Sequence, residues 1–155
     1  MFIIYGLIAI VSVIIDQFTK YLAVVNLQGK ASFHIIGDFL RFSYVENRGA
    51  AFGMLQNQRV FFIVATIILS LVLIYMIWFS KRITKPAKLT LSLVFGGAIG
   101  NFIDRLRLGY VVDFIDVRFG SVYNFPVFNI ADSCLVVGIT ILIFLILFNK
   151  FDTKE

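Results

Sequence analysis

Two aspartates stand at the edges of apolar segments, one just after a long apolar segment and the other just inside the next one. Asp113 lies in Val-Val-Asp-Phe at residues 111–114, and Asp132 lies in Phe-Asn-Ile-Ala-Asp-Ser at residues 128–133. Two carboxylates held side by side cannot both ionise cheaply, so one of them retains a proton. The ionised carboxylate can take a proton from water while the protonated one donates to a carbonyl oxygen. If the two side chains face each other, the pair can therefore carry out acid–base hydrolysis, the chemistry by which aspartic proteases cut a peptide bond.

The residues around Asp132 also allow a purely structural interpretation. Asn129 and Asp132 have the spacing of a helix N-cap and its third residue, an Asn-x-x-Asp capping box. A helix N-terminus favours a charged carboxylate, which would make Asp132 the base of the pair. Asp113, in turn, could be a solvated acid in an interfacial loop. Their position on consecutive antiparallel segments that meet at one level favours the catalytic hypothesis.

Other charged residues interrupt the apolar segments. Asp16 and Lys20 are four residues apart with the acid first, which is the favourable order for an ion pair on one helix face. Asp104 and Arg105 are neighbours in sequence, and such neighbours do not face each other on a helix. We therefore expect Arg105 to reach another helix or a loop. For these charged residues we prefer a scaffold role to a catalytic one.

Small residues in the third apolar segment predict a close helix contact. Gly96 and Gly100 form a GxxxG-type face, which lets two helix backbones approach each other. Asn101 lies one turn beyond Gly97, so its side chain can form a hydrogen bond across the bundle. Packing is the expected role of this face.

The sequence gives little support to metal or nucleophile chemistry. The single His34 has no second histidine or cysteine nearby, so we expect no metal site. The single Cys134 excludes an intrachain disulfide and lies in an apolar run, as suits a small buried or lipid-facing residue. The net charge is +5, but basic stripes interleaved with stacking aromatic residues are absent. We expect no nucleic-acid binding and no cofactor.

The composition indicates a membrane protein. Of 155 residues, 60% are hydrophobic and 15% are charged, whereas soluble domains average roughly 45–50% and about 25%. We expect one all-α integral membrane domain with four transmembrane helices, at about 2–25, 60–79, 89–107 and 128–148. The first of these lacks a basic start and a small-x-small cleavage site. It is therefore interpreted as a retained helix and not as a cleaved signal peptide.

Charge and patterning predict the topology. The segment 80–88 has four basic residues and no acid, which assigns it to the cytoplasm. Four spans then place both termini in the cytoplasm and residues 26–59 and 108–127 outside. Residues 39–45 partly alternate apolar and polar side chains, and 47–49 has the residues of a turn. These patterns predict a small β-rich extracytoplasmic cap.

The distance of each acid from the end of its helix predicts that the acids lie at a similar depth in the membrane. With about 1.5 Å per residue, Asp16 and Asp104 lie roughly 22 Å from the cytoplasmic ends of their helices. Asp132 lies about 6 Å from the outer end of its own helix. In a hydrocarbon core of about 30 Å, these acids and Asp113 fall in the outer half or at its edge. A charge at mid-bilayer costs on the order of 3 kcal/mol or more, so such residues normally face the bundle interior.

Five motifs occur in a fixed order along the chain. They are Asp-Gln-Phe-Thr-Lys at 16–20, Asn-Arg-Gly-Ala-Ala-Phe-Gly at 47–53, Gly-Asn-Phe-Ile-Asp-Arg at 100–105, Val-Val-Asp-Phe at 111–114 and Phe-Asn-Ile-Ala-Asp-Ser at 128–133. With four apolar spans, this set resembles the lipoprotein signal peptidases, the type II signal peptidases of bacteria. The resemblance covers the whole chain.

The resemblance implies an aspartic endopeptidase of the bacterial cytoplasmic (inner) membrane. Such an enzyme removes the signal peptide of prolipoproteins by cutting before a diacylglyceryl-modified cysteine, near the extracytoplasmic face. It implies that Asp113 and Asp132 are the catalytic dyad. The residues implied to line or brace the site are Asp16, Lys20, Asn47, Gly49, Asn101, Asp104, Arg105, Asn129 and Ala131. Tyr44, Phe52 and Phe128 are candidate contacts to lipid or peptide, although interfacial anchoring is the commoner role of such aromatics.

The expected partners follow from the same resemblance. They are lipid-modified prolipoproteins, membrane lipid and globomycin-type cyclic peptide inhibitors, and we expect a monomer. A small ion-coupled transporter is the main alternative, because buried acids also relay protons. The acids cluster at one face, however, and the sequence has no inverted repeat. A membrane scaffold is the third hypothesis, and it predicts that loss of both aspartates is tolerated.

Overall fold

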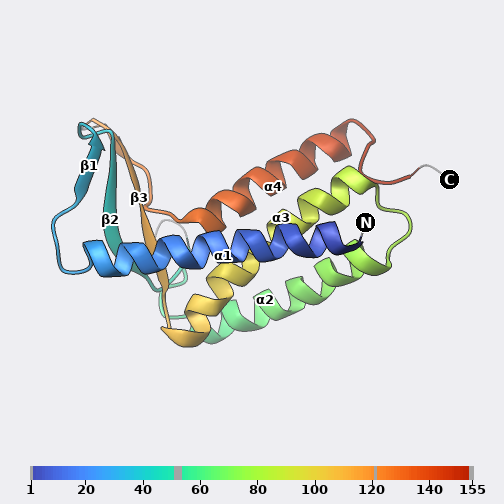
Figure 1. Cartoon of the computed structure of the whole chain (residues 1–155), viewed down its shortest axis with the longest axis horizontal. Helices are drawn as coiled ribbons and strands as arrows, with labels where there is room; N and C mark the ends of the chain where they lie inside the picture. Colours follow the sequence, from blue (N-terminus) through green and yellow to red (C-terminus); the bar gives the residue numbers. More distant parts are fainter. Residues whose placement is uncertain (1, 51–53, 121, 154–155) are drawn as a thin grey trace.

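Long apolar helices lie side by side, and a small antiparallel sheet closes one end of them (Figure 1). The computed structural model describes residues 2–50, 54–120 and 122–153. Its elements are α1 (Phe2–Leu27), β1 (Phe33–Ile36), β2 (Leu40–Asn47), α2 (Arg59–Ile74), the π-helical turn η2 (Tyr75–Phe79), α3 (Lys85–Arg107), β3 (Val111–Phe119), β4 (Tyr123–Asn124) and α4 (Ile130–Leu147).

In the described part of the chain, four helices are long and apolar enough to cross a membrane, α2 and η2 counting as one. This confirms the predicted fold class of four spans with a small β-rich cap. The third helix begins earlier than the expected span, at Lys85, because Thr84 caps it and Pro86 stands in its first turn. The fourth begins later, at Ile130, because Asn129 is its N-cap.

The sheet has the strand order β1-β2-β3-β4, with each strand antiparallel to its neighbour. Its longest pairing joins β2 to β3, with Arg41 opposite Asp116 and Val45 opposite Asp113. The loop environment considered for Asp113 was wrong, because this residue lies within β3. The β-branched run at 111–117 pairs with β2, and this tertiary pairing decides its conformation.

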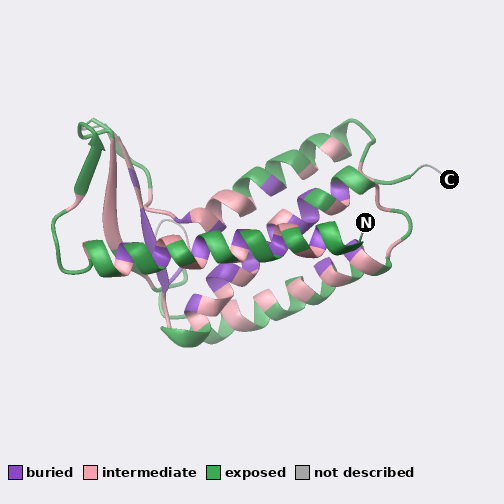
Figure 2. Ribbon diagram, in the orientation of Figure 1, coloured by how far each residue is buried: buried purple, intermediate pink, exposed green. Residues whose placement is uncertain are grey.

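Helix α3 forms the centre of the bundle because glycines allow its neighbours to approach. A Cβ atom on Gly96 would lie 2.8 Å from Cβ of Ser12 in α1, and one on Gly97 would lie 2.6 Å from the carbonyl oxygen of Ala131 in α4. The predicted small-residue face is therefore confirmed as a packing surface. Helix α3 is the most buried of the four, whereas the other three expose much of their surface (Figure 2).

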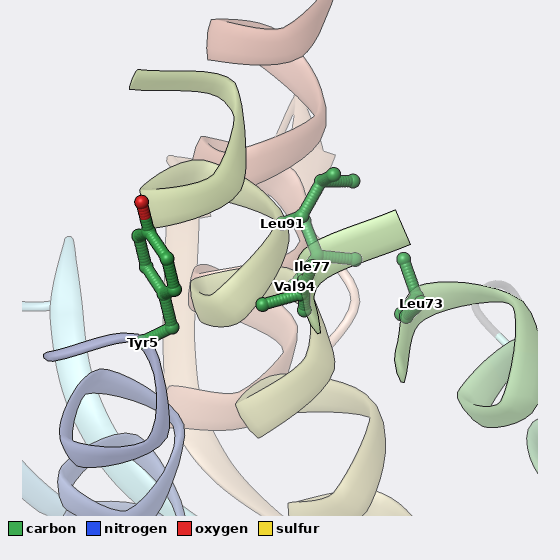
Figure 3. Packing of buried hydrophobic residues seen from close by; sticks show 5 residues of the cluster. All are labelled: Tyr5, Leu73, Ile77, Leu91 and Val94. Carbon is green, nitrogen blue, oxygen red and sulfur yellow. The ribbon is translucent and has the colours of Figure 1, made fainter. Parts of the chain in front are cut away.

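Apolar and polar packing occupy opposite ends of the bundle. Near the chain termini, a cluster of Tyr5, Leu73, Ile77, Leu91 and Val94 joins α1, α2, η2 and α3 (Figure 3). Near the sheet, the interior instead contains buried acids, a lysine and asparagines. Buried polar groups need hydrogen-bond partners, so this end of the bundle is where the structure holds its specific polar geometry.

Candidate active site

The two aspartates meet because the backbone around Phe128 is attached to β3. The N–H groups of Phe114 and Ile115 donate to the carbonyl oxygen of Phe128 at 3.1 and 2.8 Å, and Phe128 N–H donates back to Ile115 O at 3.0 Å. This short bridge lies directly beside Asp113 and directly before α4. It therefore brings the first turn of α4, with Asp132, against the strand that carries Asp113.

Asn129 connects the two carboxylates. Its side-chain amide donates to Oδ1 of Asp113 at 2.6 Å, and its backbone N–H donates to Oδ2 of Asp132 at 3.2 Å. Its side-chain oxygen accepts from the N–H of Asp132 at 2.9 Å, which completes the predicted capping box. The cap and the proposed catalytic role thus coexist in one residue pair. Asn129 is fully buried, so these bonds are shielded from competing water.

Two further asparagines complete the hydrogen bonds to the dyad. Asn47 donates to Oδ2 of Asp113 at 2.9 Å, and Asn101 donates to Oδ1 of Asp132 at 2.7 Å. The remaining oxygen of each amide is already occupied. Asn47 Oδ1 accepts from Gly49 N–H, and Asn101 Oδ1 accepts from Lys20. These acceptor roles fix which end of each amide faces its aspartate.

Lys20 is buried behind the dyad, where it contacts two further acids and Asn101. Nζ of Lys20 lies 2.9 Å from Asp16 Oδ2 and 3.0 Å from Asp104 Oδ2, and it donates to Asn101 Oδ1 at 2.9 Å. The predicted pairing of Asp16 with Lys20 is confirmed. One lysine between two carboxylates compensates charges that would be costly alone, and it orients Asn101 toward Asp132.

The same two acids hold the backbones that carry the dyad. Asp16 Oδ1 accepts from the N–H of Ala131 at 2.8 Å, and Asp104 Oδ2 accepts from the N–H of Val112 at 3.0 Å. Each acid therefore fixes a residue that adjoins a catalytic candidate. Gln17 was quoted in a motif but was not among the predicted site residues, and its amide donates to Asp104 Oδ1 at 2.9 Å. Its place three residues before Lys20, on the same helix face, was the available signal.

Arg105 reaches a loop, as predicted. Its guanidinium donates to the carbonyl oxygen of Gly49 at 3.1 Å and lies 4.5 Å from the ring centre of Phe62. It thereby holds the turn that follows Asn47 at the end of β2, in which Gly49 lies, against the end of α3. Phe52 lies outside the described residues. Tyr44 does not line the dyad's pocket, because it packs with the apolar cluster on the other face of the sheet.

Both aspartates open onto one pocket with a volume of about 460 Å³. Asn47, Gly49, Asn101 and Arg105 line its polar side. Its apolar wall comes from the segment before α4 and from α4 itself, and consists of Phe125, Pro126, Val127, Phe128, Leu135, Val136 and Val137. Asp16, Lys20, Asp104, Asn129 and Ala131 do not line this pocket and lie behind it. A pocket of this kind suits an extended apolar ligand with one polar group at the carboxylates.

Burial changes the acidity of Asp113. The side chain is 1% exposed, and this desolvation together with the charge of Asp132 raises the pKa of Asp113 to about 7. Hydrogen bonds from Asn47 and Asn129 oppose part of that increase. A carboxyl with a pKa near neutrality can act as a proton donor at physiological pH. Within the described residues, no group of three or more His, Cys, Asp or Glu side chains is placed to hold a metal ion.

The fold and the site define a class: a multi-pass membrane protein with a buried aspartate pair facing an apolar pocket. The family model for signal peptidase II, peptidase family A8, matches residues 8–148. The chain therefore belongs to the signal peptidase II family, as the sequence motifs predicted. It is a protease of a bacterial membrane.

Curated relatives and solved structures agree with this assignment. A lipoprotein signal peptidase of Caldanaerobacter subterraneus is 53% identical over 142 residues, covering 88% of this chain and 91% of the relative. One from Clostridium tetani is 40% identical over 150 residues, with 96% of each chain covered. A bacterial membrane enzyme solved by the in meso method at 2.3 Å superposes with a TM-score of 0.83 at 39% identity, covering 97% of this chain and 93% of that one.

Proposed function

We propose that this protein is an intramembrane aspartic endopeptidase that removes the signal peptide from prolipoproteins. It cuts before the diacylglyceryl-modified cysteine, using a water molecule activated by Asp113 and Asp132. The observation that carries the proposal is the shared pocket, since both carboxylates open onto it and Asn129 donates to both. The names of the relatives support the substrate class.

The environments of the two aspartates suggest different roles. Asp132 is at the N-terminus of α4, where the helix dipole favours the charged carboxylate, so it acts as the base. Asp113, with its pKa of about 7, acts as the acid. The proton nevertheless belongs to the pair, because two interacting carboxyls titrate together.

The reaction then follows from these roles. Asp132 takes a proton from water, and the water oxygen attacks the carbonyl carbon of the scissile peptide. Asp113 donates its proton to the carbonyl oxygen, which gives a tetrahedral diol. On collapse the peptide C–N bond breaks, the carboxyl product forms, and the leaving amine takes up a proton from the dyad. No step needs a covalent enzyme intermediate.

The position of the pocket supports a lipid-modified substrate. Its apolar wall includes Leu135, Val136 and Val137 of α4, a helix whose surface is largely exposed and apolar. A substrate held in the bilayer by its acyl chains can thus enter sideways. Its scissile bond would lie at the level of the sheet, where the dyad lies.

The orientation in the membrane is part of the proposal. The basic segment 80–88 and both chain termini lie at the end of the bundle opposite the sheet (Figure 1). The positive-inside rule assigns that end to the cytoplasm and the dyad to the extracytoplasmic side. We further propose that the chain acts as one domain and as a monomer, and that globomycin-type cyclic peptides compete for the pocket.

Cleavage of a lipid-modified prolipoprotein by the purified protein tests the proposal. Asp113→Asn and Asp132→Asn should each lower turnover by at least about 10²–10⁴-fold, the contribution of a general acid or base. The exposed Asp38 provides a matched control, and Asp38→Asn should cleave like the wild type. Normal cleavage by either dyad variant, with the fold intact by circular dichroism, would refute the mechanism.

A second assay separates the peptidase from a transporter. The protein in liposomes should show no proton flux above that of empty vesicles, because the buried acids cluster at one end of the bundle and do not cross it. Flux that disappears in the Asp113→Asn variant, in the absence of cleavage, would favour the transporter instead.

A further inference from the structure

A second pocket lies on the opposite face of the sheet from the dyad. Its volume is about 560 Å³, and it lies between the last turns of α1 and the sheet. Leu22, Ala23 and Leu27 of α1 form one wall, and Phe42 and Phe114 of the sheet form the other. The volume is within the range of roughly 300–1,000 Å³ that small-molecule sites occupy.

This pocket is separate from the active site. Asp113 and Phe114 are successive residues of β3, so their side chains point to opposite faces of the sheet. The residues that line the two pockets do not overlap. The proposed cleavage reaction makes no use of this second pocket, and its large apolar walls are not explained by that reaction.

The lipid bilayer around the pocket indicates which kind of ligand the pocket binds. The pocket is at the end of a membrane-spanning helix, at the level where a bilayer changes from acyl chains to headgroups. The exposed apolar side chain of Ile15, one turn before the lining residue Thr19 on the same face of α1, continues from it into the bilayer. The apolar part of a membrane lipid is therefore the ligand that this pocket meets at the highest concentration.

The polar end of the pocket carries excess positive charge. Lys30 lies on its rim, and none of its described lining residues is acidic. Ser32, also in the lining, is hydrogen-bonded to Ser43 at 2.8 Å, and Ser43 donates to the buried Asp116 at 2.9 Å.

The ion-paired network beside the pocket belongs to the other face of the sheet. Asp116 is paired with Arg41 at 2.7 Å and with Arg118 at 3.2 Å. Arg41 lies directly across from Asp116, and Phe42, the next residue of β2, lines the pocket, so Arg41 and Asp116 point away from it. Among the described lining residues Lys30 is therefore the charged side chain that complements an anionic headgroup.

We propose that this pocket binds one anionic phospholipid, with an acyl chain between α1 and the sheet and its phosphate near Lys30. The bound lipid supports the face of β3 that backs the dyad, because Phe114 adjoins Asp113. A ligand that binds only the folded protein raises its unfolding temperature, so binding is measurable without substrate.

Thermal unfolding in detergent, with added phosphatidylglycerol or phosphatidylcholine, tests this inference. Phosphatidylglycerol should raise the unfolding temperature of the wild type at lower concentrations than phosphatidylcholine does. Lys30→Gln should weaken the phosphatidylglycerol response about fivefold, the effect expected for one basic side chain at an anionic membrane surface. Lys30→Arg should keep the response.

Two further variants make the result specific to the pocket. Ala31→Trp fills the pocket from the exposed loop and should abolish the response to both lipids. Lys81→Gln, at the other end of the bundle, should respond like the wild type. The inference is overturned if both lipids act equally on the wild type, or if Lys81→Gln weakens the response as much as Lys30→Gln does. Because no step measures cleavage, the result is independent of the peptidase proposal.

Discussion

At the scale of single residues, three asparagines decide the geometry of the dyad. Asn47, Asn101 and Asn129 each use the side-chain oxygen as an acceptor elsewhere, which leaves the amide nitrogen to donate to an aspartate. A buried amide with both ends occupied cannot flip without breaking several hydrogen bonds. The aspartates are thus held by donors of fixed direction.

Two substitutions of Asn129 distinguish its role as the N-cap of α4 from its role as a hydrogen-bond donor to Asp113. Asn129→Ala loses the helix cap, about 1 kcal/mol, and leaves buried acceptors without a donor, about 1–3 kcal/mol. Asn129→Ser can still cap α4, so it should unfold at a higher temperature than Asn129→Ala. Both variants lack the donor to Asp113, and we expect turnover to fall about a hundredfold in each, as a misplaced catalytic group does.

Thermal unfolding and cleavage rates measured on the same samples check this expectation. The exposed Asn124 is a suitable control, since Asn124→Ser should change neither quantity. Cleavage by Asn129→Ser at the wild-type rate would show that the shared donor is dispensable.

The pKa of Asp113 predicts the pH dependence of cleavage. The dyad needs one proton, and Asp113 loses its proton as the pH rises through about 7. The turnover number should therefore decline above that pH, and the decline should track the ionisation of the pair. Initial rates between pH 5 and 9 measure it. A turnover number that stays constant over this range would contradict the assignment of Asp113 as the acid.

The same pKa predicts the sign of a stability change. The folded pKa of about 7 exceeds the ordinary value of 3.8, so between these values the folded state holds the proton more tightly than the unfolded state does. Stability contributed by this group is therefore complete below about pH 4 and declines up to pH 7. The unfolding temperature of Asp113→Asn, relative to the wild type, should increase from pH 5 to pH 8. A difference that does not change with pH would contradict it.

At the scale of elements, α3 and β3 do most of the positioning. Helix α3 supplies Asn101, Asp104 and Arg105, and its glycines set its distance from α1 and α4. Strand β3 supplies Asp113 on one face and Phe114 on the other. The bridge from β3 to Phe128 then determines where α4 begins. A small shift of α3 would thus disturb the whole hydrogen-bonded network.

Two glycines give a matched test of helix packing. A Cβ on Gly96 would lie 2.8 Å from Cβ of Ser12 and 2.9 Å from the carbonyl oxygen of Ala9, so Gly96→Ala must push α1 away from α3. We expect a loss of about 1–3 kcal/mol, as for other overpacked sites. A Cβ on Gly6 meets nothing within 4 Å, so Gly6→Ala should stabilise α1 by roughly 0.5–1 kcal/mol.

Unfolding temperatures of the two variants in one detergent compare these effects directly. Cleavage should fall with Gly96→Ala, because α3 also carries Asn101, and should stay unchanged with Gly6→Ala. Equal stability of the two variants would show that the α1–α3 contact tolerates a methyl group.

At the scale of the whole molecule, the arrangement has two distinct ends. The sheet and the polar network lie at one, and the basic segment, the termini and an apolar cluster lie at the other (Figure 1). The proposed topology predicts that only the sheet end is reachable from outside the cell. In a Cys134→Ala background, an impermeant maleimide should label Val122→Cys in intact cells and Lys81→Cys only after lysis. The reverse pattern would invert the topology.

The sequence alone predicted that there are four spans, identified the family, and singled out Asp113 and Asp132 as the candidate dyad. Apolar length and charge are local properties, and a carboxylate within an apolar helix is conspicuous wherever it lies. The capping box and the Asp16–Lys20 pair were also predictable, because their partners are three or four residues apart on one helix.

Only the tertiary structure decided how these residues meet. The conformation of β3 depended on pairing with β2, which lies more than sixty residues earlier in the chain. The positions of Asp113 and Asp132 depended on the backbone bridge at Phe128 and on Asn129, whose donors span three elements. Such contacts depend on the closeness of distant segments, which local patterns do not encode. The second pocket could not be predicted for the same reason. Asp113 and Phe114 are adjacent in the sequence, but β3 places their side chains on opposite faces of the sheet.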